Sequence, residues 1–500
     1  MSGLLSDISE ERPHSTDESN SVIKNAPVQP KTITANGDLL VEYVDASSVW
    51  QVSSKHLELH SPYFRALLEP DKFAEGEFLA RQRRALSELN LSPADSPEGG
   101  PPCDLPTLKI PANSTVTLCG VEALEVFLKV LCEQSMAEAQ RDQFLGALRI
   151  ESPSLIARMI QVADRFNSPD PVHSILWKVN YLFGRRDTFS LERFDPALLK
   201  MKEHRIRQNI VVARFMKKHS IQQTLTHTLI ITGSKFWSDG LEMPPLGEHL
   251  RWQFLPDDIE EELYIRRHCV MNTITDLQAH FLRVYGALED EDVHKPTSSP
   301  AIMSTVLAPP SQTRQFQCRA GMANASQCDL FHLGQTTRFF AMRAKTIFLG
   351  SNLIDHYFTI AGSDGEDGKD TGNDAMMPPG LPSDITAILA SMKQFPDYQI
   401  DSNHQSCGVR RRLLPILVCI DKYLLDPRAL LGIDSESWDQ PVDRKRRYWA
   451  HRPRDHTVDI RFSQILAIRS PSTRARPATL HSAAQDAFLL FTAKKRNWEA

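Results

Sequence analysis

Two pairs of cysteine and histidine residues in the C-terminal part of the chain carry side chains that could bind a metal ion. Cys318 and Cys328 are separated by nine residues, and His404 and Cys407 form an H-x-x-C pair. Tetrahedral zinc needs four such ligands, and two local pairs brought together across a core are a common way to supply them. The sequence therefore offers these four residues as a candidate structural zinc site, with His332 as a substitute ligand.

The same residues allow two other interpretations. Buried thiols pack as small hydrophobic side chains, so the cysteines could be ordinary core residues beside a capping histidine. The C-x9-C spacing is also unlike the usual C-x2-C zinc knuckle. His404 and Cys407 could instead form a catalytic thiolate pair, with Asp401 or Asn403 orienting the imidazole.

The sequence lacks the established catalytic and nucleotide-binding motifs. It contains no G-x-x-x-x-G-K-[ST], no G-x-G-x-x-G after a strand, no G-x-S-x-G and no H-E-x-x-H. We therefore predict a non-enzymatic protein with no catalytic residues and no cofactor other than the candidate zinc ion.

A basic run at residues 443–454, DRKRRYWAHRPR, could serve as a nuclear-import signal or as a contact surface for nucleic acid. Its ordinary interpretation is a solvated surface whose aromatic residues pack against the fold. The net charge of −5 gives no overall field that would attract nucleic acid, so we do not expect a nucleic-acid partner. The cations of this candidate patch are Arg444, Lys445, Arg446, Arg447, Arg452 and Arg454.

The composition is that of an ordinary globular protein, with 41% hydrophobic and 24% charged residues in a chain of 500. Eight cysteines are too sparse for a disulfide scaffold. The longest apolar runs are shorter than the roughly 18 to 20 residues of a transmembrane helix, and the first thirty residues show no secretion or transit pattern. We expect an intracellular protein without a membrane partner, in either nucleus or cytoplasm.

Alternating apolar residues near the N-terminus predict a β-hairpin, and the residues after it predict helices and one further strand. Ser53 and Ser54 precede a first short helix as capping residues, and Pro62 begins a second at a favoured first-turn position. This order of elements is α+β. The predicted strands are 38–44, 49–53 and 107–110, and the later helices are 121–131, 152–166 and 171–182.

Residues 37–76, GDLLVEYVDASSVWQVSSKHLELHSPYFRALLEPDKFAEG, resemble the opening of BTB/POZ domains of the fungal type. IARMIQVADRF at Ile156–Phe166 resembles the fourth helix of that fold, and residues 395–417 resemble the C-terminal part of fungal BTB-containing proteins. Two departures stand out: a long insertion at residues 81–104, and a polar stretch, Glu133–Gln143, where the family has a short strand. The resemblance implies homodimers or bound partner proteins, in some members a cullin scaffold that recruits a ubiquitin ligase.

The remainder of the chain predicts helices separated by polar segments. Apolar residues including Leu263, Val270, Leu277 and Leu288 mark one face of a long helix at 257–288, which would be either a packed element or a partner-binding arm. Further helices are expected at 205–216, 221–231, 329–348 and 409–425, the last kinked at Pro415.

The predicted fold is an α+β BTB/POZ-like N-terminal domain followed by a mostly α-helical C-terminal region with disordered loops. We predict a protein–protein interaction module or scaffold. The alternatives are a substrate adaptor of a cullin-type ubiquitin ligase and a nuclear regulatory protein with a basic nucleic-acid-binding segment. The predicted divisions are a disordered tail at 1–31, the BTB/POZ-like domain at 32–184 with a loop insertion at about 84–105, a helical extension at 185–288, a flexible linker at 289–314, and a helical region at 315–500 with a disordered loop at about 362–382.

Overall fold

A computed structural model of the chain describes a large part of the sequence. The predicted linker at 289–314 and the predicted loop at 362–382 lie outside the described residues, as do residues 1–29 of the predicted tail. The described residues are 30–43, 48–88, 105–110, 114–184, 191–237, 249–285, 318, 325–344, 384–405, 407–439, 449, 457–459, 481–493 and 495–498.

The N-terminal unit is built on a small mixed sheet with the order β1-β3-β2-β4. The predicted hairpin is present: β2 (Leu39–Tyr43) pairs antiparallel with β3 (Ser48–Val52). Side chains alternate between buried and half-buried along β2, as expected for a strand with one face on a core. β4 (Thr107–Ile110) lies parallel to β2, and the short β1 (Lys31–Thr32) lies parallel to β3, so the predicted tail ends before Lys31.

Helices pack on this sheet and on one another to complete an α+β unit. Phe166 stacks on Phe64 and on Phe127, with ring centroids 5.3 and 5.5 Å apart. Ser61 joins the same cluster, because its hydroxyl accepts from the Phe64 amide and donates to the Phe166 carbonyl. The helices of this unit are α1 (Ser54–His60), α2 (Pro62–Leu68), α3 (Ala74–Glu88), α4 (Ser114–Cys119), α5 (Val121–Leu131), α6 (Glu138–Arg149), α7 (Pro153–Arg165) and α8 (Pro169–Lys178).

One sequence prediction within this unit is wrong. The insertion predicted as a loop from about residue 84 begins inside a helix, because α3 continues to Glu88. The polar stretch at 133–143 forms no strand, in agreement with the sequence: a 3-10 turn, Glu133–Ser135, leads into α6. Among the residues of α6, Leu148 alone is classed as buried, so most of this helix faces solvent and its sequence carries little apolar periodicity.

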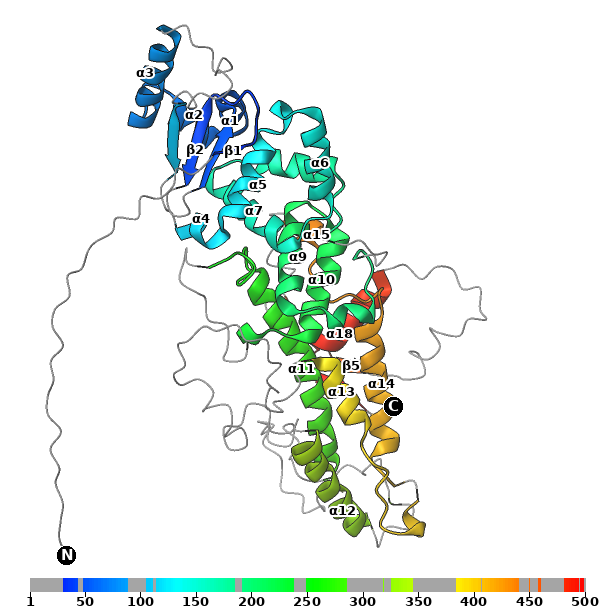
Figure 1. Cartoon of the computed structure of the whole chain (residues 1–500). Helices are drawn as coiled ribbons and strands as arrows, with labels where there is room; N and C mark the ends of the chain where they lie inside the picture. Colours follow the sequence, from blue (N-terminus) through cyan, green and yellow to red (C-terminus); the bar gives the residue numbers. More distant parts are fainter. Residues whose placement is uncertain are drawn as a thin grey trace, which may run out of the picture.

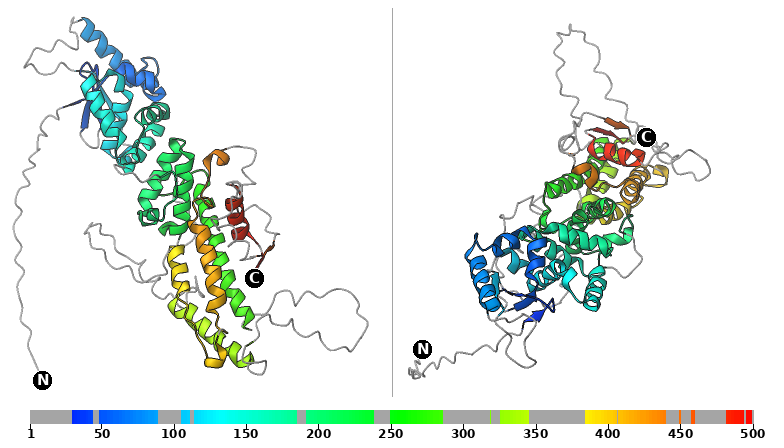
Figure 2. Two further views of the ribbon diagram at one scale, coloured as in Figure 1. Left: turned by 90° about the vertical axis from the view of Figure 1, so that its right-hand side faces the viewer. Right: turned by 90° about the horizontal axis from the view of Figure 1, so that it is seen from above.

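The rest of the described chain is mostly helical, as predicted. The molecule is elongated, with the α+β unit at one end and α12 at the other (Figures 1 and 2). α9 packs against α7 and so joins the two regions. The main elements are α9 (Glu203–Phe215), α10 (His219–Thr232), α11 (Ile259–Val284), α12 (Ala325–Arg338) with a π-helix at Phe339–Arg343, α13 (Ile385–Lys393), α14 (Arg410–Leu425) with Pro415 inside it, α15 (Ser435–Trp438), β5 (Thr457–Asp459), α18 (His481–Thr492) and β6 (Lys495–Asn497).

The long helix α11 is a packed central element and not a partner-binding arm. The apolar face predicted for it, including Leu263, Val270 and Leu277, is completely buried, and Leu288 lies outside the described residues. The helix begins at Ile259, because Asp257 and Asp258 both adopt left-handed backbone conformations with φ of 60° and 64°. α10, α12 and α18 all contact α11, which explains why its apolar face has no surface left for a partner.

None of the helices in the described part of the chain combines the length and the apolar character needed to cross a membrane.

Candidate metal centre

The four predicted metal ligands come from two segments that are far apart in the sequence. Cys318 precedes α12, and Cys328 lies in the first turns of that helix. His404 ends a short 3-10 helix, Ser402–His404, and Cys407 lies just before α14. The turn between α13 and α14 lies at the same end of the molecule as α12 (Figure 1), so the fold places the two pairs side by side.

The side chains of these residues converge. One ligand atom each of Cys318, Cys328 and His404 lies within 4.8 Å of the others. The fourth residue, Cys407, has its thiol in contact with that of Cys328. Cys328, His404 and Cys407 are buried, Cys318 is half-buried, and all three cysteines are free thiols. The structure therefore brings three of the four sequence-predicted residues within 4.8 Å of one another and places the thiol of the fourth, Cys407, beside that of Cys328.

His404 is oriented by a neighbouring carboxylate. Asp401 Oδ1 lies 2.8 Å from His404 Nδ1 and also accepts from the backbone amides of Asn403 and His404. The hydrogen bond with His404 lowers the pKa of the Asp401 carboxyl. Nδ1 therefore carries the proton, whereas Nε2 is buried and has no hydrogen-bond partner among the residues that the structure describes.

The cluster is an unfavourable place for isolated negative charge. Burial, together with the adjacent thiols of Cys318 and Cys407, raises the pKa of the Cys328 thiol to about 12. The guanidinium of Arg412 also lies close by, and its pKa is lowered by burial despite the opposing influence of Tyr285 and Cys407. The raised pKa keeps the Cys328 thiol protonated when no metal ion is bound, and a divalent metal ion would stabilise it as a thiolate.

His332, the substitute ligand, is, like Cys407, not one of the three residues whose ligand atoms lie within 4.8 Å of one another. It lies one helical turn after Cys328 on α12, is buried, and has its ring centroid 5.8 Å from that of Tyr285. Burial lowers the pKa of its imidazole, and the nearby Arg412 and His404 act in the same direction. His332 is thus a neighbour of the cluster.

The structure contains one of the contacts that a catalytic role of His404 and Cys407 would require. Asp401 does orient His404, as that role requires, whereas the interaction of Asn403 with Asp401 is through its backbone amide. However, Cys407 is only 7% exposed and Cys328 only 3%. A substrate would have little access to either sulfur, so the arrangement suits an enclosed metal ion better than a nucleophile.

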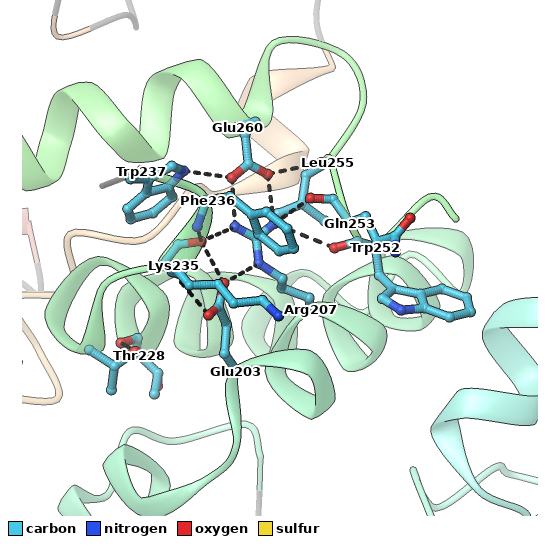
Figure 3. A network of polar contacts seen from close by, with 12 residues as sticks. Glu203, Arg207, Thr228, Lys235, Phe236, Trp237, Trp252, Gln253, Leu255 and Glu260 are labelled. Carbon is cyan, nitrogen blue, oxygen red and sulfur yellow. Dashed lines mark hydrogen bonds and ion pairs between the residues drawn. The ribbon is translucent and has the colours of Figure 1, made fainter. Parts of the chain in front are cut away.

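A second polar cluster, which the sequence did not reveal, lies between α9 and α11 (Figure 3). Arg207 is 1% exposed and forms a bidentate ion pair with Glu260, with distances of 2.8 and 2.6 Å. Its Nε also donates to Glu203, and Nη2 donates to Ser234 Oγ. Trp237 Nε1 adds a 2.6 Å hydrogen bond to Glu260 Oε1.

This second cluster is structural. The N–H groups of Arg207 all have acceptors, because Nη1 also points at the carbonyls of Trp252 and Gln253. Burial alone would lower the pKa of Arg207, but the hydrogen bonds and charges of Glu260 and Glu203 raise it, so the guanidinium stays charged. No donor of Arg207 is left for a ligand, in contrast to the unpartnered Nε2 of His404.

The candidate basic patch is outside the part of the chain that the structure describes. Arg444 to Arg447, Arg452 and Arg454 all lie there, whereas Trp449 between them is described. Trp449 is buried, packs edge-on against Phe488, and lies under the guanidinium of Arg266 at 5.3 Å. This aromatic residue is therefore part of the fold and does not offer a stacking surface to nucleic acid.

Comparison with known proteins gives no neighbour from which a function could be transferred. No protein-family model, no curated protein and no solved structure matches this chain.

Proposed function

We propose that this protein is a non-enzymatic interaction module whose N-terminal α+β unit is a BTB/POZ-type domain. The order of elements supports this proposal. The β2–β3 hairpin leads into the helix pair α1–α2, and β4 then returns to pair with β2. The residues that resemble the family, 37–76, form the first part of this arrangement. Because a fold can host many functions, a binding function depends on the residues that the fold exposes at its surface.

The observation that carries the proposal is the exposure of two aromatic residues near the N-terminal end of α3, Phe73 immediately before the helix and Phe78 within it. Phe73 is 49% exposed and Phe78 is 53% exposed. The opposite side of the helix packs on the domain, because Leu79 is buried and Gly76 lies against the Glu69 carbonyl. Exposed aromatic residues are typical anchors of protein interfaces, where their burial supplies much of the binding energy. We therefore assign the partner-binding face to α3.

Substitution of both phenylalanines tests this assignment. The full chain carrying Phe73→Ser and Phe78→Ser is compared with the unmodified chain and with Leu118→Ser, which changes a 41% exposed leucine on α4 of the same unit. Self-association is measured by size-exclusion chromatography with light scattering. Heterologous partners are identified by affinity capture and mass spectrometry, and each is then titrated as a purified protein.

We expect the unmodified chain to bind a second copy of itself or a purified partner. The double variant should bind at least tenfold more weakly, and Leu118→Ser should bind with unchanged affinity. Capture of a cullin scaffold in this pattern would specify the ubiquitin-ligase version of the proposal. The proposal is overturned if the unmodified chain is monomeric and binds no purified partner, or if the double variant retains every assembly.

A further inference from the structure

We propose that Cys318, Cys328, His404 and Cys407 bind one structural zinc ion, which links α12 to the turn between α13 and α14. This inference does not depend on the interaction function of the N-terminal unit. It rests on the convergence of four soft donors, on the orientation of His404 and on the charge balance of the surrounding side chains.

The spacing of the ligand atoms suits a tetrahedral zinc ion. Zn–S bonds of about 2.3 Å and Zn–N bonds of about 2.0 to 2.1 Å place neighbouring ligand atoms roughly 3.5 to 3.8 Å apart. The three atoms of Cys318, Cys328 and His404 already lie within 4.8 Å of one another. A contraction of about 1 Å, which side-chain rotation can supply, would bring these three atoms into bonding distance of one ion. The thiol of Cys407, which interacts with that of Cys328, would be the fourth ligand.

His404 is prepared for metal binding by its second hydrogen bond. Zinc-bound histidines usually donate their other ring N–H to a carboxylate or carbonyl, which fixes the tautomer and the ring orientation. The 2.8 Å contact between His404 Nδ1 and Asp401 Oδ1 has this form. It leaves Nε2 as an acceptor that is buried and unpartnered within the described residues. A metal ion would satisfy this nitrogen, which otherwise incurs the cost of burial without a hydrogen bond.

The local charges also fit. Three thiolates, one neutral imidazole and one Zn²⁺ carry a net charge of −1. The guanidinium of Arg412 lies near Cys328 and Cys407 and would balance this charge. Binding would release the three thiol protons to solvent, with no oxidation or reduction.

The proposed role of the ion is to hold the fold together. All four ligands come from the protein, which is typical of structural zinc, whereas catalytic sites keep one position open for water or substrate. In the sequence, Cys318 and Cys328 precede the long segment 345–383, and His404 and Cys407 follow it; the segment itself is outside the described residues. A zinc ion would thus fix the end of the molecule at which α12 meets the α13–α14 turn.

The test uses the full chain, expressed with added zinc chloride and purified without chelator. Elemental analysis by mass spectrometry should find about one zinc per chain, and Cys328→Ser and His404→Ala should each lose most of it. Cys419→Ser is the matched control, because this buried thiol on α14 lies outside the cluster and should retain full zinc. His404→Cys, which restores a soft ligand, should recover binding.

A second measurement covers variants that fail to fold. Zinc is removed from the unmodified chain with a chelator and replaced with cobalt(II) chloride, whose tetrahedral thiolate complexes have intense visible and near-ultraviolet absorption. We expect this spectrum, and a melting temperature that falls on chelation and recovers with zinc. His332→Ala should keep both properties, since the proposed site does not use His332 as a ligand.

Several results would overturn the proposal. These are a freshly purified chain without stoichiometric zinc that also fails to bind cobalt, a Cys318–Cys328 disulfide in that metal-free chain, or equal zinc loss in Cys419→Ser and Cys328→Ser. Zinc that survives His404→Ala and is lost in His332→Ala would overturn the ligand assignment.

Discussion

Asp401 accepts hydrogen bonds both from the ring of His404 and from its backbone amide, so a single carboxylate determines the position and the tautomer of the imidazole. Asp401 itself is about half exposed. It can therefore be substituted without opening the core, which makes it a sensitive probe of the proposed metal centre.

We expect Asp401→Ala to weaken zinc binding by roughly 10- to 100-fold, the usual effect of removing a carboxylate that orients a zinc-bound histidine. Asp401→Asn should have a smaller effect, because the amide oxygen can still accept from Nδ1. Zinc affinity is measured by competition with a chromophoric chelator.

Asp142→Ala provides the control for this measurement. Asp142 is a 70% exposed carboxylate on α6, in the distant α+β unit, and its removal should leave zinc affinity unchanged. Equal affinities for Asp401→Ala and the unmodified chain would show that His404 does not depend on this contact to bind metal.

The buried ion pair between Arg207 and Glu260 yields a prediction about stability. Glu260→Ala leaves a guanidinium inside the core with Glu203 as its remaining carboxylate, and loss of one partner of a buried pair costs about 3 to 5 kcal/mol. Glu261→Ala changes the next residue of α11, which is exposed, and should cost no more than about 0.5 kcal/mol. Urea unfolding followed by tryptophan fluorescence measures both, since Trp237 and Trp252 contact this network. Equal stability of the two variants would mean that Arg207 and Glu260 do not form a buried ion pair.

Elements with strong local signals could be predicted from the sequence. β4 (Thr107–Ile110) and α5 (Val121–Leu131) have the predicted bounds, because a strand with alternating burial and a helix with a continuous apolar face both leave a clear period. α6 and α18 (His481–Thr492) were missed. α6 buries little of its surface, so its formation is not recorded in an apolar pattern.

Of the two polar clusters, one could be predicted from the sequence and the other could not. Cysteine and histidine are uncommon residues with specific chemistry, so Cys318, Cys328, His404 and Cys407 could be nominated from sequence before their distances were known. Arg207 and Glu260 could not be nominated, because charged residues on helices are normally exposed and nothing local pairs residues so far apart. The left-handed conformations of Asp257 and Asp258 were not predicted either, and because of them α11 begins two residues after the predicted start at 257.

Stability should depend on pH through His227. Complete burial lowers the pKa of this imidazole from 6.5 to about 4. Its neutral form is required, because Nε2 donates to the Leu424 carbonyl while Nδ1 accepts from the Leu431 amide. The stabilising contribution is therefore present above pH 6.5 and is lost as the pH falls toward 4, by about 2 kcal/mol between pH 7.5 and pH 5.

The difference between His227→Gln and the unmodified chain isolates this contribution from other titrating groups. Urea unfolding at pH 7.5, 6 and 5 should show a steeper loss of stability for the unmodified chain. His204→Gln, which changes an exposed histidine on α9, should have the slope of the unmodified chain. Parallel pH profiles for His227→Gln and the unmodified chain would mean that His227 is not buried as described.

Gly432 lets the segment after α14 lie directly against α10, and this close approach gives the last prediction. A Cβ at this position would lie 1.8 Å from the Gln223 carbonyl oxygen and 2.7 Å from Thr226 Oγ1. The segment cannot easily move away, because Thr226 accepts from the Ile433 amide and Arg266 donates to the Gly432 carbonyl. Gly432→Ala should therefore be destabilising by several kcal/mol, in the range of other steric and hydrogen-bond disruptions of a core.

The same substitution at another glycine should have the opposite effect on the stability of the fold. Gly146 lies on the exposed side of α6, and a Cβ built there meets nothing within 4 Å. Gly146→Ala should stabilise the protein by about 0.5 to 1 kcal/mol, because alanine loses less backbone entropy in a helix. Chemical unfolding of both variants measures the contrast. Similar effects of the two substitutions would mean that the segment at Gly432 does not pack on α10, and the contacts of His227 with Leu431 would then need revision as well.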